Sequence, residues 1–266
     1  MQLTWHSRWH STIMAIAVAV LCAGGIAALQ IPQLNELRNA GELLTPQQAA
    51  RNVERERLQL NLLQRLPTVG FDNVIANWTL INFFIYLGDD VARGYTGYQL
   101  SPEYFRIIID RDPRFVEAYL FMSSGVSLYA GRPDITIELM EKGLQYITPG
   151  IPPQSYYVWR YKAVDQLLFL GDGQGAQQSF ETAAEWARLY NDEESKAVAD
   201  ISQETADFLA ANPISTRARI NAWGLIFNTT TDQKTRQISR QRILELGGDI
   251  RISPEEGVQI RYPTTD

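Results

Sequence analysis

The residues that could perform covalent or metal chemistry are few and lie at the start of the chain. Both histidines, His6 and His10, and the one cysteine, Cys22, fall near the N-terminus of this 266-residue sequence. The chain beyond Leu29 therefore offers no thiol nucleophile, no histidine base and no Cys/His zinc ligands. Carboxylates could still act alone, and four lie close together in two pairs: Asp89, Asp90, Asp110 and Asp112.

The spacing of these four carboxylates is typical of helix ends and turns. No second catalytic group accompanies them in the sequence, so a carboxylate hydrolase has little support. We therefore expect no catalytic residue, no metal ion and no cofactor. The formal net charge of −6 gives the chain no general attraction for a polyanion, so we also expect no nucleic-acid partner.

Residues 12–29 form an uncharged apolar run that is long enough to cross a membrane. Eighteen residues at 1.5 Å each span roughly 27 Å, close to the thickness of a hydrocarbon core. Trp5 and Trp9 suit an aromatic belt, which favours a retained anchor, although a cleaved secretory signal remains open. Arg8 precedes the run, and the positive-inside preference then places the N-terminus in the cytoplasm.

A repeated pattern organises the middle of the chain. A glycine is followed after five, nine and twelve residues by a small, a large apolar and a second small residue. The two occurrences are Thr136, Met140 and Gly143 after Gly131, and Ala176, Phe180 and Ala183 after Gly171. Small residues on either side of a large one let two helices approach closely, so the pattern predicts paired helices with each glycine in the turn. After Gly131, we expect Asp134 to cap the second helix of the pair.

This pattern resembles the A-x3-F signature in the second helix of tetratricopeptide (TPR) repeats, and the resemblance covers roughly residues 72–190. The resemblance implies an all-α helical-repeat (α-solenoid) domain that binds other proteins. An apolar N-terminal helix followed by such repeats also looks like the membrane-bound assembly factors of photosynthetic bacteria. That likeness implies a plasma or thylakoid membrane and subunits of a membrane complex as partners.

The remaining segments are assigned from their hydrophobic periodicity and their Gly and Pro breaks. We expect Asp72–Gly88 to be a helix that is buried between its neighbours, followed by a loop at Asp89–Leu100. Alternating apolar residues around Pro254–Gly257 predict a β-hairpin. The predicted segments are a flank at 1–11, a transmembrane helix or signal anchor at 12–32, a linker and lead-in helix at 33–67, TPR-like repeats at 68–190, degenerate or capping helices at 191–248 and a hairpin tail at 249–266.

The predicted binding groove is lined by the first helix of each pair, as in helical repeats generally. Counting back from the two turn glycines gives the candidates Phe121, Gly125, Leu128, Tyr161, Asp165 and Leu168. Some of these residues are expected to pack the core. These six residues are our prediction for the protein-binding groove.

Charge is segregated in the later part of the chain. Residues 181–207 carry eight acidic residues against Arg188 and Lys196, and the segment that follows is basic. The two segments either attract each other within the fold or present a basic face to an acidic partner or anionic lipid. The candidate basic face consists of Arg217, Arg219, Lys234, Arg236, Arg240 and Arg242.

The sequence thus favours a non-catalytic, membrane-anchored scaffold that binds other proteins through a helical-repeat groove. The alternative is an exported binding or accessory protein that is released by signal cleavage. The two hypotheses differ in whether residues 12–29 persist in the mature protein.

Overall fold

The computed structural model is mainly helical, as the sequence predicts, and has an antiparallel pair of short strands near the C-terminus. The chain divides into two units, Met1–Asn52 and Val53–Asp266. The structure describes residues 14, 17–28, 30–31, 44–67, 69–212, 215–230, 233–253 and 257–263.

The first unit contains part of the predicted anchor. Residues 17–28 are helical, whereas residues 12, 13, 15, 16 and 29 of the apolar run lie outside the described residues. Among the residues that the structure describes, no helix combines the length and the apolar character that a membrane span requires. The predicted flank at 1–11 and most of the linker also lie outside the described part of the chain.

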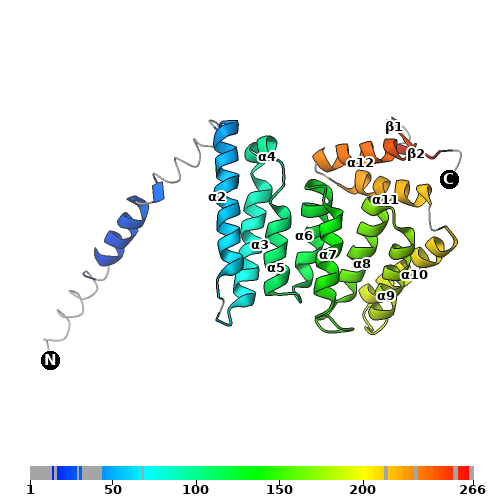
Figure 1. The fold of residues 1–266 in the computed structure, drawn as a ribbon, viewed down its shortest axis with the longest axis horizontal. Helices are drawn as coiled ribbons and strands as arrows, with labels where there is room; N and C mark the ends of the chain where they lie inside the picture. Colours follow the sequence, from blue (N-terminus) through cyan, green and yellow to red (C-terminus); the bar gives the residue numbers. More distant parts are fainter. Residues whose placement is uncertain are drawn as a thin grey trace, which may run out of the picture. The chain divides into compact units, whose positions relative to one another are not determined.

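The second unit is a row of helices joined by short turns (Figure 1). Its first half contains α2 (Pro46–Arg65, which begins in the first unit), α3 (Asp72–Gly88), α4 (Asp90–Thr96), α5 (Ser101–Arg111), α6 (Val116–Met122) with the π-helix η1 (Ser123–Tyr129), and α7 (Pro133–Leu144). Its second half contains α8 (Tyr156–Asp165) with the π-helix η2 (Gln166–Leu170), α9 (Gly173–Ala187), α10 (Glu193–Ala211), α11 (Thr216–Thr229), α12 (Gln233–Glu245) and the strands β1 (Asp249–Ser253) and β2 (Gly257–Arg261).

Three helix pairs form the centre of this unit: α3 with α5, α6–η1 with α7, and α8–η2 with α9. We call α3, α6–η1 and α8–η2 the first helices and α5, α7 and α9 the second helices. Gly131 and Gly171 end the two first helices that the repeated pattern marks, with φ angles of +67° and +68°. Both glycines therefore occupy the left-handed turn conformation that the sequence predicts for them.

Small residues set the spacing between these helices. All six residues of the repeated pattern are buried, which confirms that the pattern marks helix contacts. A Cβ atom on Gly143 would overlap the Tyr119 side chain, and one on Gly125 would overlap the ring of Phe83. The neighbouring aromatic rings occupy the space that a larger residue would need, so the helices approach closely at these two points.

Two local predictions are wrong. The segment after α3 is expected to be a loop, but Asp90–Thr96 forms the short helix α4 because the Asp89 carboxylate accepts a hydrogen bond from the Ala92 N–H (3.0 Å). Asp134 is expected to cap α7, but the helix starts at Pro133 and Asp134 instead forms a two-point ion pair with Arg132 (2.7 and 2.9 Å).

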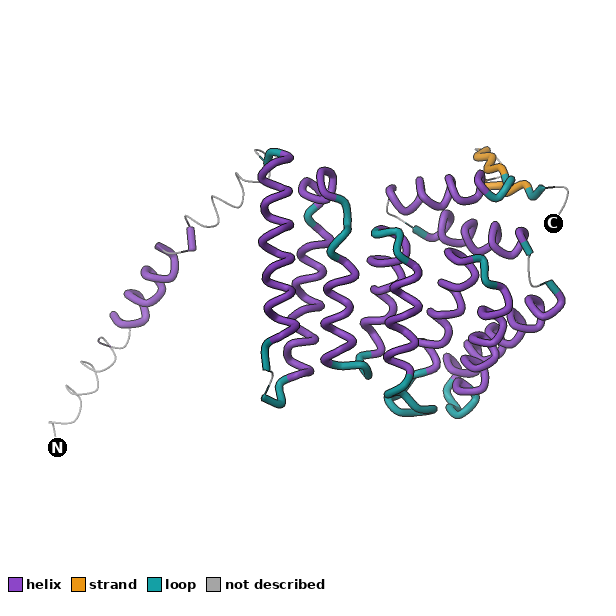
Figure 2. The backbone as a smooth tube through the Cα atoms, in the orientation of Figure 1, coloured by secondary structure: helices purple, strands orange, loops and turns teal. Residues whose placement is uncertain are grey.

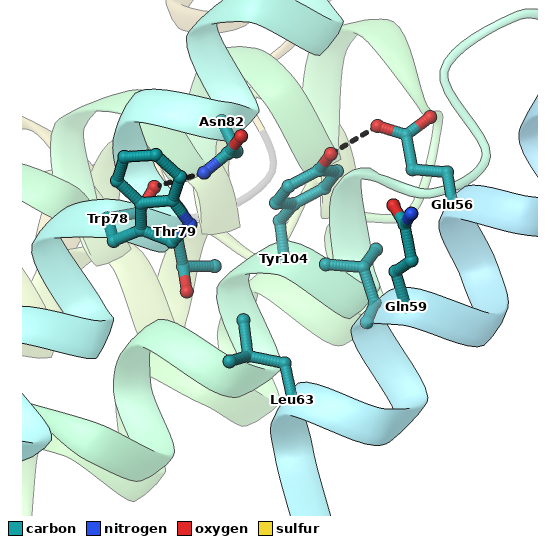
Figure 3. A pocket seen from close by; sticks show the side chains of 8 residues that line it. Glu56, Gln59, Leu63, Trp78, Thr79, Asn82 and Tyr104 are labelled. Carbon is teal, nitrogen blue, oxygen red and sulfur yellow. Dashed lines mark hydrogen bonds between the residues drawn. The ribbon is translucent and has the colours of Figure 1, made fainter. Parts of the chain in front are cut away.

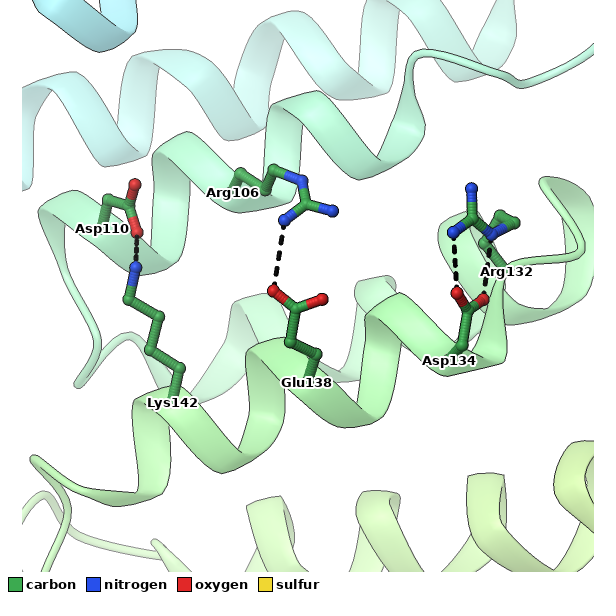
Figure 4. Close-up of polar contacts among 6 residues, drawn as sticks. All are labelled: Arg106, Asp110, Arg132, Asp134, Glu138 and Lys142. Carbon is green, nitrogen blue, oxygen red and sulfur yellow. Dashed lines mark hydrogen bonds and ion pairs between the residues drawn. The ribbon is translucent and has the colours of Figure 1, made fainter.

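Ion pairs join the second helices α5 and α7 on an exposed face (Figure 4). Arg106 contacts Glu138 at 3.4 Å, and Lys142 pairs with Asp110 one helical turn away. Because these side chains are largely exposed, such pairs contribute at most about 1 kcal/mol each. They help to fix the register of the two helices, whereas the buried side chains hold them together.

The C-terminal helices and the hairpin form a separate cluster. Trp223 and Ile220 of α11 are fully buried against Leu168 and Ile243. The two strands are antiparallel, as the predicted hairpin requires, and pair Ile250 with Ile260. Figure 2 shows the two strands beside the last helices.

A substitution at Gly125 tests the close helix contact. We expect Gly125→Ala to lower the free energy of unfolding by about 1–3 kcal/mol, because the new methyl group must displace the ring of Phe83. Gly94→Ala in α4 is the matched control, since its Cβ would meet no atom within 4 Å. Chemical denaturation of both variants measures the difference, and equal stabilities would contradict this packing.

Candidate protein-binding surfaces

The helix α3 exposes an apolar stripe, contrary to the expectation that its neighbours bury it on all sides. Val74, Trp78, Ile81 and Ile85 follow one another at helical spacing, and each is more than half exposed. The opposite face of the helix is covered, with Phe83 fully buried. The sequence shows that α3 is apolar all round, but only the positions of its neighbours show which face stays open.

This apolar surface continues from α3 onto α6. The rings of Phe84 and Phe121 meet edge to face, with centroids 4.7 Å apart. Leu120, next to Phe121 in the chain, is 47% exposed. The helices α3 and α6 therefore present one continuous apolar surface. We call it the α3–α6 surface (Val74, Trp78, Ile81, Phe84, Ile85, Leu120 and Phe121). Contiguous apolar patches of this kind mark interaction sites on soluble domains.

A small polar pocket lies beside Trp78, at one edge of this surface. Figure 3 shows Trp78 and Asn82 of α3 facing Tyr104 of α5 and Glu56 of α2, around a cavity of about 150 Å³. Tyr104 donates a hydrogen bond to the Glu56 carboxylate, and Asn82 donates to the Trp78 carbonyl (2.7 Å). Burial and the bond to Glu56 raise the pKa of Tyr104, so its hydroxyl remains a donor near neutral pH.

The third first helix contributes aromatic residues. Tyr157 and Tyr161 of α8 stack with centroids 5.7 Å apart, and the Tyr157 hydroxyl donates to Glu194 of α10 (2.6 Å). Burial is the main cause that raises the pKa of both tyrosines. Large amphipathic rings with a fixed hydroxyl are common anchors in protein interfaces.

A second apolar surface lies between α10 and α11. Here the side chains enclose a groove of about 470 Å³, which we call the α10–α11 groove. Leu167, Leu168 and Phe180 contribute buried atoms to it, whereas Leu225 on α11 is 65% exposed. Ile201 and Phe208 of α10 line the groove and are also exposed. The sequence does not predict this groove, because its exposed walls come from α10 and α11, which lie outside the repeated pattern.

A buried carboxylate lies between two of the first helices, α6–η1 and α8–η2. Asp165, at the junction of α8 and η2, is fully buried and accepts a hydrogen bond from the Ser123 hydroxyl (2.5 Å). Its second carboxylate oxygen, Oδ1, is buried without a hydrogen-bond partner in the described part of the chain. Burial raises the pKa of Asp165 to about 7, although the hydroxyls of Ser123 and Ser127 oppose that change.

The structure separates the six predicted groove residues into two groups. Phe121, Leu128 and Tyr161 are partly exposed. Gly125, Asp165 and Leu168 are buried and contribute to packing, and of these three only Leu168 lines a groove, the α10–α11 groove. Of the exposed group, Phe121 lies on the α3–α6 surface, Tyr161 stacks with Tyr157, and Leu128 packs against the cluster around Trp223.

The predicted basic residues make local contacts. Lys234 lies over the ring of Tyr98 (4.1 Å) and Arg217 over that of Tyr262 (4.8 Å). Arg242 pairs with Glu245 of its own helix (2.9 Å) instead of with the acidic segment.

Three further residues complete the predicted basic face. Arg236 donates to the Thr230 carbonyl (2.8 Å), and Arg240 is exposed. Burial, and to a lesser extent the charge of Arg242, lower the pKa of Arg219. Most of these basic residues thus contact the C-terminal cluster and stabilise it. Binding of an acidic partner by the same residues stays a prediction.

Comparison with known proteins identifies no relative. No protein-family model matches the chain, and no curated protein or solved structure matches it.

The buried carboxylate gives a prediction for stability. The pKa of Asp165 is about 7 in the folded protein and 3.8 ordinarily, so the folded state binds this proton more tightly. The resulting stabilisation is fully present below the ordinary pKa and is lost as the pH rises through about 7. We expect the free energy of unfolding to fall by a few kcal/mol, in order of magnitude, between pH 4 and pH 8.

Denaturation of Asp165→Asn across this pH range checks the assignment. The variant should lose this part of the pH dependence and should be more stable than the wild type at pH 8. Asp90→Asn, at an exposed position of α4, should retain the wild-type profile. An Asp165→Asn profile parallel to that of the wild type would refute the assignment.

Proposed function

We propose that this protein is a scaffold that binds another polypeptide across its first helices. The α3–α6 surface is the single observation that carries the proposal, since it presents six exposed large apolar side chains and the half-buried Phe121 on two neighbouring helices. Leaving such a surface in water costs free energy, and a partner that covers it recovers roughly 25 cal/mol per Å² of apolar area. The aromatic residues Trp78 and Phe121 suit the centre of an interface.

The proposed scaffold belongs to the class of helical-repeat proteins. Three helix pairs support this class, as do the buried small residues and the left-handed turn glycines of two of these pairs. In repeat proteins the first helices form one continuous surface, so several helices can contact a partner together.

The proposal includes anchoring through residues 12–29. The uncharged composition of this run supports a membrane anchor. A tethered scaffold with an apolar surface fits a role in assembling subunits of a membrane complex. The resemblance in layout to assembly factors of photosynthetic bacteria makes a photosynthetic complex our specific proposal.

Site-specific cross-linking tests the binding surface. A photo-reactive phenylalanine analogue at Leu120 of the full-length protein in its native membrane should give a discrete adduct with one partner. The same probe at Gln178, an exposed residue of the second helix α9, should give none. Ile81→Glu should abolish the Leu120 adduct, because the charge would be buried in the same interface.

Two outcomes count against the proposal. Equal cross-linking at Leu120 and Gln178 would indicate random collision, and an Ile81→Glu adduct of wild-type yield would place the partner elsewhere. The intact mass of the mature protein separates the anchored scaffold from an exported, cleaved protein, because only the anchored form retains residues 12–29.

A further inference from the structure

The helix α2 exposes apolar residues at the end of the second unit. Val53 and Leu60 face the core and are buried, whereas Leu58 and Leu62 on the opposite face are 68% and 61% exposed. The terminal elements of stacked helical repeats usually present a polar outer face to water. The outer face of α2 (Arg55, Leu58, Leu62 and Arg65) therefore has the character of an interface.

The charges on this face specify what can cover it. Arg55 and Arg65 are both exposed and lie three residues before Leu58 and three residues after Leu62. If α2 packed antiparallel on the α2 of a second copy, with the leucines in contact, Arg55 would face Arg65 of that copy. Like charges in this position repel, so a symmetric pairing of this face is disfavoured. An apolar surface with carboxylates beside it is the complementary partner.

The described residues of the chain contain such a surface on α10. Asp200, Glu204 and Asp207 follow one another at helical spacing, and all three are exposed. They lie beside Ile201 and Phe208, which line the α10–α11 groove. No ion pair joins any of these carboxylates to a cation among the described residues.

One cation also lies at the groove. Arg160 lines it and is held by a hydrogen bond to the Ser202 hydroxyl (3.3 Å). The α10 wall carries three carboxylates, whereas Arg160 supplies one positive charge, so the charge along this wall of the groove is negative overall. The groove volume of about 470 Å³ lies in the range of sites that enclose inserted groups, so it can accept leucine side chains.

We propose that this protein associates with itself head to tail, with the outer face of α2 of one copy docked in the α10–α11 groove of the next. Figure 1 shows α2 and α10–α11 at opposite ends of the second unit, so the contact must join two copies. The leucines enter the groove while Arg55 and Arg65 approach the carboxylates of α10. A contact between two different surfaces is heterologous and generates rings or open chains.

Two apolar variants test the proposal in solution. Sedimentation velocity of the full-length protein in detergent should show a mass that rises with concentration beyond a dimer. Leu58→Asp/Leu62→Asp removes the docking face, and Ile201→Asp/Phe208→Asp removes the groove, so each variant alone should remain a monomer. Their mixture retains one intact face and one intact groove, and it should form one-to-one dimers and nothing larger.

Charge reversal provides an independent arm that leaves the apolar residues in place. Arg55→Glu/Arg65→Glu should weaken association at least about tenfold, because it places acidic residues against an acidic wall. Adding Asp200→Lys, Glu204→Lys and Asp207→Lys to the same chain should restore it. High salt should weaken association of the wild type.

Defined results would overturn the proposal. These are a wild-type mass that is independent of concentration, a mixture of the two apolar variants that stays monomeric, or a combined charge reversal that fails to restore association. Far-ultraviolet circular dichroism confirms that each variant is folded. The Leu120 cross-link reports on a different surface, so the two proposals can fail separately.

Discussion

The close approach of helices at small residues is the constraint on which the rest of the second unit depends. Gly125 lies against the rings of Phe83 and Phe105, and Gly143 lies against Tyr119. These rings fill the space between neighbouring helices, so the spacing of the helices is fixed by contact between rigid groups. That spacing places Phe121 beside Phe84 and so joins the exposed residues of α3 and α6 into one surface.

Much of this architecture is encoded locally and could be predicted from the sequence. The turn glycines Gly131 and Gly171 indicate the backbone conformation of the turns, and the small residues that follow each of them indicate where two helices are in contact. The hairpin register follows from the alternation of Ile250 and Ile260 around a turn. Such signals depend on a few neighbouring residues, so tertiary context alters them little.

The predicted site was less accurate because it assumed an unbroken helical period. The candidates Gly125, Leu128 and Leu168 were placed by counting turns of 3.6 residues. The structure has π-helical segments at Ser123–Tyr129 and Gln166–Leu170, and a π turn takes in an additional residue. The residues within them therefore point in different directions from those that the count gives. Leu168 is in addition buried against Ile220 and Trp223 of α11, a helix outside the repeated pattern.

The two ends of the second unit differ in a way that bears on assembly. At the C-terminal end, Trp223 is buried under α12 and the hairpin, while α2 at the other end leaves Leu58 exposed. If residues 12–29 anchor each copy, all copies share one orientation and move in one plane. Confinement of this kind raises the effective concentration of the docking face around the groove without any new contact. The head-to-tail contact that forms in solution is then strengthened at a membrane and can produce ordered arrays, and each array would repeat the α3–α6 surface at a constant interval.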